Sequence, residues 1–223
     1  METNILFPSI AHIVNILAGI MLVSSLLVLT QKGMHACINL FIIHSFFLSL
    51  VMAVVAFGMH EPHLYIGFLL MLMLKVGLIP GMLFWLIKEI KVNREVQFYI
   101  NTSSSLLIAG ALTVFSFYIT HRVFPTGAPF SQTALTMALA MMLIGFFIMI
   151  SRTKALTQML GFLFMENSLF FLASITTFGI PFFIEVSISF DVLVALLIMG
   201  IFLFKINQTF HHINVSQLQE NKE

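Results

Sequence analysis

Four ionisable side chains lie inside apolar stretches of the sequence that are long enough to cross a bilayer. Lys75 stands near the middle of one stretch, Glu166 near the middle of another, and Glu185 and Asp191 lie in a third. An intramembrane charge costs at least about 2.5–3.5 kcal/mol on insertion scales, so its default interpretation is functional. We therefore predict that Lys75, Glu166, Asp191 and Glu185 belong to a proton pathway.

The residues around Lys75 and Glu166 suit proton exchange. Pro80 follows Lys75 closely, and it is expected to kink the helix and free a carbonyl for a polar side chain or water. Asn167 and Ser168 add hydrogen-bonding groups directly after Glu166. A buried carboxyl beside a lysine is subject to opposing effects, desolvation and ion pairing, which suit a group that gains and loses a proton. A structural ion pair that only fixes helix packing remains an alternative.

The depths of these charges are similar. From the rise per residue of a helix, Lys75 and Glu166 each lie roughly 18 Å from the outer surface, and Asp191 roughly 12 Å. The three charges are thus expected to form a lateral polar line, with Glu185 at its outer mouth, although the sequence does not show that their faces meet. His44 is interpreted as a packing histidine, although a histidine can relay protons.

The composition requires a membrane. The chain has 223 residues, of which 60% are hydrophobic and 9% charged, whereas a soluble domain carries about 25% charged residues. The net charge of +1 provides no field to attract nucleic acid. Cys37 is the single cysteine, and an iron–sulfur cluster needs several thiolates. We therefore expect no cofactor and no metal in this chain.

Seven apolar segments separated by short polar breaks predict an all-α, polytopic membrane protein. A crossing needs about 20 apolar residues, and no signal-peptide cleavage pattern follows the first segment. The segments are 9–30, 36–57, 64–87, 99–120, 130–151, 156–178 and 183–204.

The lysines and arginines alternate between the two sides of this arrangement. One side carries eight of them and the other carries Arg122, with Lys75 left out as intramembrane. Because the richer side faces the cytoplasm, the N-terminus is predicted outside and the C-terminus inside. The eight are Lys32, Lys88, Lys91, Arg94, Arg152, Lys154, Lys205 and Lys222.

Three motifs together resemble component E, a membrane subunit, of hydrogenase-4-type complexes. They are Lys-Val-Gly-Leu-Ile-Pro at 75–80, the run 161–168 with Met-Glu-Asn at its centre, and the run 185–200 that starts at Glu185 and includes Asp191. Their order, their spacing and the chain length all agree with that family. The resemblance spans nearly the whole chain.

The last three segments also resemble the small K-type membrane subunit of complex I and its relative in multisubunit sodium/proton antiporters. Those proteins carry one acidic residue in each of their last two helices. Asp191 falls at the second acid, and Glu166 is displaced by about one helical turn from the first. The organisation is then one membrane domain over 1–223. It comprises a four-helix part at 1–129, a K-like three-helix part at 130–206 and a cytoplasmic polar tail at 207–223.

The resemblance implies a non-catalytic subunit in the cell (inner) membrane that contributes to proton translocation. Its implied partners are the lipid bilayer, antiporter-like and other membrane subunits, and cytoplasmic hydrogenase subunits with nickel–iron and iron–sulfur centres. A subunit of a cation/proton antiporter complex without a redox partner remains an alternative. A retinal protein would need a lysine in the middle of its last helix, where this chain has Lys205 at the cytoplasmic end. A stand-alone transporter is disfavoured because the two halves show no clear repeat.

Overall fold

The computed structural model describes residues 3–59, 62–90, 99–124, 131–177 and 200. Within these ranges six helices are long and apolar enough to cross a membrane, which confirms six of the predicted spans and the all-α membrane class. The seventh predicted span, 183–204, lies outside the described residues apart from Gly200. The elements are α1 (Thr3–Thr30), α2 (Met34–Met59), α3 (Pro62–Met71), the π-helix η1 (Leu72–Leu78), α4 (Ile79–Ile90), α5 (Thr102–Val123), α6 (Gln132–Ser151) and α7 (Ala155–Thr177).

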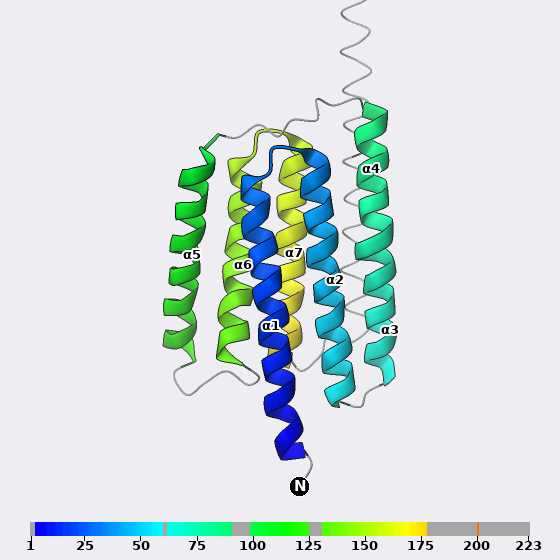
Figure 1. Cartoon of the computed structure of the whole chain (residues 1–223), viewed down its shortest axis with the longest axis vertical. Helices are drawn as coiled ribbons and strands as arrows, with labels where there is room; N and C mark the ends of the chain where they lie inside the picture. Colours follow the sequence, from blue (N-terminus) through cyan, green and yellow to red (C-terminus); the bar gives the residue numbers. More distant parts are fainter. Residues whose placement is uncertain (1–2, 60–61, 91–98, 125–130, 178–199, 201–223) are drawn as a thin grey trace, which may run out of the picture.

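The helices stand side by side as an antiparallel bundle (Figure 1). Residues 31–33 join α1 to α2 and residues 152–154 join α6 to α7, and such short connections hold consecutive helices next to each other. In the most apolar stretch of α7, 67% is buried inside the bundle, whereas the corresponding share for α5 is 17%. Helix α7 is therefore central. Helix α5 at one edge, and α3, η1 and α4 at the opposite edge, are peripheral.

Basic residues gather at one end of the bundle. Lys32, Lys88 and Lys154 lie at the end where α1, α4 and α6 finish, and Arg122 lies at the other. Arg152, also at the basic end, is not an exposed loop charge, because it is buried and its Nη2 donates to the carbonyl of Val28 at 2.7 Å. This bond caps the C-terminal turn of α1. Which end faces the cytoplasm stays a prediction from charge.

Two apolar cores fill the bundle, one toward each end. Their buried members are separated by residues 22–27 on α1, 42–47 on α2, 72–78 on the third span and 165–169 on α7. On α6 only residues 142 and 143 separate them. The four gaps contain a set of buried polar side chains, which we call the polar layer: Ser24, Ser25, His44, Ser45, Lys75, Glu166, Asn167 and Ser168.

Two glycines bring α6 and α7 into backbone contact. A Cβ built on Gly145 would lie 2.6 Å from the backbone nitrogen of Met165, and one on Gly161 would lie 2.5 Å from that of Met149. Small residues allow close helix approach in membranes. Because Met165 precedes Glu166, this contact fixes the position of Glu166 in the polar layer.

Replacing Gly145 by alanine is expected to destabilise the protein by about 1–3 kcal/mol, because the new methyl group would force α7 away from α6. The control is Gly19→Ala on α1, where an added Cβ meets nothing within 4 Å. That variant should be neutral, or more stable by up to about 1 kcal/mol through helix propensity. Thermal unfolding in mild detergent measures both. Equal melting temperatures for the two variants would contradict the proposed role of the glycine contact.

Candidate functional site

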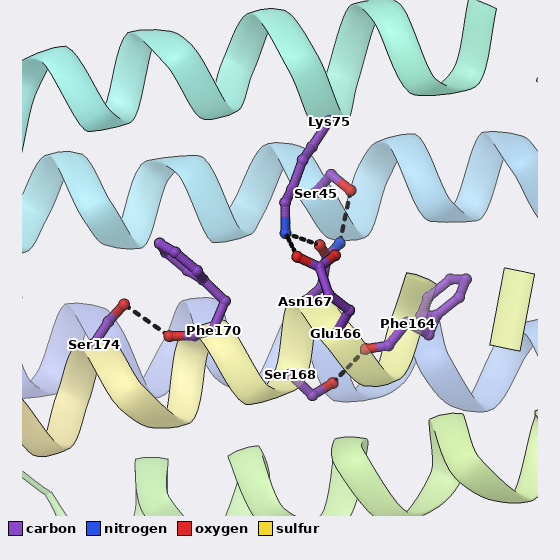
Figure 2. Close-up of polar contacts among 8 residues, drawn as sticks. All are labelled: Ser45, Lys75, Phe164, Glu166, Asn167, Ser168, Phe170 and Ser174. Atoms are coloured by element: carbon purple, nitrogen blue, oxygen red, sulfur yellow. Dashed lines mark hydrogen bonds and ion pairs between the residues drawn. The ribbon is translucent and has the colours of Figure 1, made fainter. Parts of the chain in front are cut away.

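Lys75 and Glu166 form an ion pair across the bundle. Lys75 Nζ from η1 lies 2.6 Å from Glu166 Oε1 of α7, and their side chains are 1% and 8% exposed (Figure 2). Charge-assisted hydrogen bonds of this length are strong. Removal of two charges from water is expensive, and only a close partner and further hydrogen bonds compensate for it. The structure thus brings together two of the four residues that the sequence singled out.

Asn167 links this pair to α2. Lys75 Nζ donates to Asn167 Oδ1 at 2.8 Å, and Asn167 Nδ2 donates to Ser45 Oγ at 2.8 Å (Figure 2). The lysine ammonium also lies 5.2 Å from the centre of the Phe170 ring, a favourable cation–π distance. The ammonium therefore has two further partners on α7, which remain if Glu166 is neutralised.

The helix that carries Lys75 departs from α-helical geometry at that residue. Residues 72–78 form a π-helix, in which Ile79 donates its N–H to the carbonyl of Leu74, five residues earlier. In the same register residue 80 would donate to the carbonyl of Lys75, but Pro80 has no N–H. The kink that the sequence predicted near Pro80 is therefore a stretch of π-helix that ends just before the proline. π-Helical turns inside α-helices are frequently found at functional sites.

One oxygen of the Glu166 carboxyl has no partner among the described residues. Oε2 is buried and accepts no hydrogen bond there, whereas Oε1 is held by Lys75. A buried polar atom without a partner is uncommon and needs an explanation. A carboxylate oxygen in this situation is a place where a proton or a water molecule can bind.

Of the other candidate residues, the structure describes Ser168 but neither Glu185 nor Asp191. Glu185 and Asp191 lie outside the described residues, so the expected line from Glu166 to Asp191 stays a prediction. Ser168 belongs to the polar layer but donates to the carbonyl of Phe164 on its own helix at 2.7 Å, and so is not a partner of the ion pair (Figure 2). Within the described ranges, no cluster of three His, Cys, Asp or Glu residues could hold a metal ion.

Relatives cover nearly the full length of the chain. No protein-family model and no solved structure matches it. An uncharacterized protein of Mycobacterium tuberculosis is 27% identical over 212 residues, which are 95% of this chain and 96% of that protein. Hydrogenase-4 component E of Escherichia coli is 24% identical over 206 residues, which are 92% of this chain and 95% of that protein. The same values hold for component E of Shigella flexneri.

The chain is a distant homologue of hydrogenase-4 component E. The resemblance inferred from the three sequence motifs is thereby confirmed. The relation of residues 130–206 to K-type subunits stays a prediction.

Ser45, which accepts the hydrogen bond from Asn167, was not predicted as a site residue from the sequence of this component E homologue. A serine inside a membrane helix usually bonds the carbonyl one turn earlier, and nothing in the apolar stretch around Ser45 marks it as different. Its role depends on Asn167 of α7 pointing toward it, which is a tertiary contact.

Proposed function

We propose that the chain is a non-catalytic membrane subunit of a hydrogenase-4-like assembly related to complex I, and that it contributes to proton translocation. The observation that carries this proposal is the buried Lys75–Glu166 pair in the polar layer, in a homologue of component E. Electron transfer then belongs to cytoplasmic partner subunits that hold nickel–iron and iron–sulfur centres. This chain holds no cofactor in the proposal and resides in the cell inner membrane.

The arrangement of the pair favours exchange of protons over packing alone. Well-packed apolar residues often replace a buried ion pair without loss of stability, so packing gives little reason for charge at this position. Lys75 Nζ and Glu166 Oε1 lie 2.6 Å apart, so in this proposal a proton exchanged at one group changes the charge directly beside the other. Oε2 of Glu166, which has no hydrogen-bond partner among the described residues, supplies a position for the incoming proton.

A proton that arrives at Oε2 neutralises the carboxylate and weakens its bond to Lys75. The ammonium keeps the Asn167 oxygen and the Phe170 ring as partners, so it is free to lengthen its contact with Glu166 without becoming isolated. Departure of the proton restores the pair. We propose that Asp191 and Glu185 continue the pathway, as the resemblance to K-type subunits implies, and that water molecules bridge the remaining gaps.

The partners of the chain test this assignment. A C-terminal tag, purification in mild detergent and mass spectrometry should recover a nickel–iron hydrogenase large subunit together with antiporter-like membrane subunits. Recovery of antiporter-like subunits without hydrogenase subunits would contradict the redox assembly and favour the antiporter complex. Recovery of the chain alone, stable and monodisperse, would contradict both.

A further inference from the structure

His44 on α2 is buried completely and reaches helix α1. Its Nδ1 lies 3.0 Å from Ser24 Oγ, 3.2 Å from the carbonyl oxygen of Met21 and 3.4 Å from Ser25 Oγ. The imidazole is 0% exposed. The next residue, Ser45, accepts the hydrogen bond from Asn167 in the Lys75 site. Two consecutive residues of α2 thus face two different polar groups of the same layer.

The surroundings of Nδ1 fix the tautomer of His44. Ser24 and Ser25 donate their hydroxyl hydrogens to the carbonyl of Met21, at 2.6 and 3.1 Å. The carbonyl and both serine oxygens then offer only lone pairs toward Nδ1, so Nδ1 carries the hydrogen. A fixed hydrogen at one ring nitrogen leaves a lone pair at the other. Nε2 therefore keeps its lone pair, on the part of the ring that does not face α1.

Nε2 has no hydrogen-bond partner among the described residues although it is buried. A buried polar atom without a partner is destabilising, and Oε2 of Glu166 is in the same situation among the described residues. Both atoms belong to the polar layer between the two apolar cores. Helix α7 carries Glu166 and also contacts His44, because Phe164, two residues before Glu166, packs edge-on against the His44 ring with centroids 4.9 Å apart.

We propose that His44 is a second proton-binding residue, and that the polar layer extends the proton pathway from Lys75 across α7 and α2 to α1. This inference rests on the proposed function of the Lys75–Glu166 pair. A proton delivered by water binds Nε2 and gives an imidazolium ion, Nδ1 keeps its hydrogen, and release of the proton from Nε2 to water restores the neutral ring. Each cycle conserves protons and needs no redox partner.

Few charged groups of the described elements face this histidine. Helix α1 presents Ser24 and Ser25 and no ionisable side chain in the layer, and α6 contains no ionisable residue. Glu166 on α7 and Lys75 on η1 are the other ionisable members of the polar layer. Occupancy of His44 should therefore respond to the charge state of that pair.

The test is the number of protons translocated per electron by the purified complex in liposomes, with reduced viologen as electron donor. His44→Gln should lower this ratio by about tenfold or more, the scale of a lost proton-transfer group, while hydrogen formation continues. His121→Gln, on the exposed end of α5, is the matched control and should keep the wild-type ratio. A wild-type ratio in His44→Gln would overturn the inference. The parallel variant Glu166→Gln shows whether the proposed function fails as well.

A second variant decides the question if His44→Gln does not assemble. Ser24→Ala combined with Ser25→Ala keeps the histidine but removes the hydroxyls beside Nδ1. The pH profile of translocation should shift in this variant, because hydrogen bonds to one form of a titratable group change its affinity for a proton. An unchanged profile would overturn the inference, since a histidine that only packs would leave that profile in place.

Discussion

Replacement of Lys75 by methionine is expected to destabilise the protein by about 3–5 kcal/mol, since removal of one member of a buried ion pair leaves an uncompensated charge. Methionine has nearly the length of the lysine stem, so the loss measures the charge and its hydrogen bonds more than the volume. The carboxyl of Glu166 and the oxygen of Asn167 would both lose their donor. Thermal unfolding in mild detergent, with the wild-type protein as reference, measures the loss.

A second replacement should recover most of that stability. In the double variant Lys75→Met with Glu166→Met, both charges are gone and two apolar side chains of similar length face each other, which is often neutral or stabilising. Unfolding of the two single variants and the double variant gives the coupling between the positions. If Lys75→Met is as stable as the wild type, or if the double variant is no more stable than Lys75→Met, the interpretation of the pair as a close charge interaction is wrong.

Replacement of Glu166 by glutamine is expected to leave assembly intact and reduce proton translocation by about tenfold or more, because the amide cannot take up and release the proton. Glutamine keeps the volume and retains an oxygen for Lys75, whose ammonium is also bonded to Asn167. Liposomes with the purified complex and a pH-sensitive dye measure the effect. Glu166→Asp, which keeps a carboxyl on a shorter stem, is the matched control and should retain part of the activity. Undiminished translocation in Glu166→Gln would exclude Glu166 from the pathway.

The sequence predicted the described spans closely because their signal is length and apolarity, and both depend on the bilayer. Predicted and observed ends differ by a few residues; the first span, for example, begins at Thr3 in place of residue 9. Lys75 and Glu166 also stood out, because charge is rare at such depth.

The contacts between helices were harder to read from the sequence. A helix that is apolar all round shows no stripe that marks its inner face. The sequence therefore placed Lys75 and Glu166 at similar depths in the membrane but did not show that their side chains meet. Ser45 became visible only once α7 was placed against α2. The π-helix over residues 72–78 was predicted only in part. Pro80 indicated a kink in the helix near Lys75, but the sequence did not show that it would take the form of a π-helix.

His44 illustrates a different limit. A single histidine in an apolar segment is more often a packing residue, and its sequence neighbours do not distinguish it. The structure changes this interpretation through two facts that the sequence does not contain. These are the donors and acceptors of α1 around Nδ1, and an Nε2 that has no hydrogen-bond partner within the described ranges.

The most direct test of the central claim is the ratio of protons translocated per electron in the double variant Lys75→Met with Glu166→Met. This variant removes the chemistry of the pair while it keeps an apolar, packed site, so stability and function are separated. We predict a complex that assembles, unfolds near the wild-type temperature and forms hydrogen, but builds up no larger proton gradient than liposomes treated with a protonophore. A wild-type ratio in this variant would contradict the claim and reduce the Lys75–Glu166 pair to a structural contact.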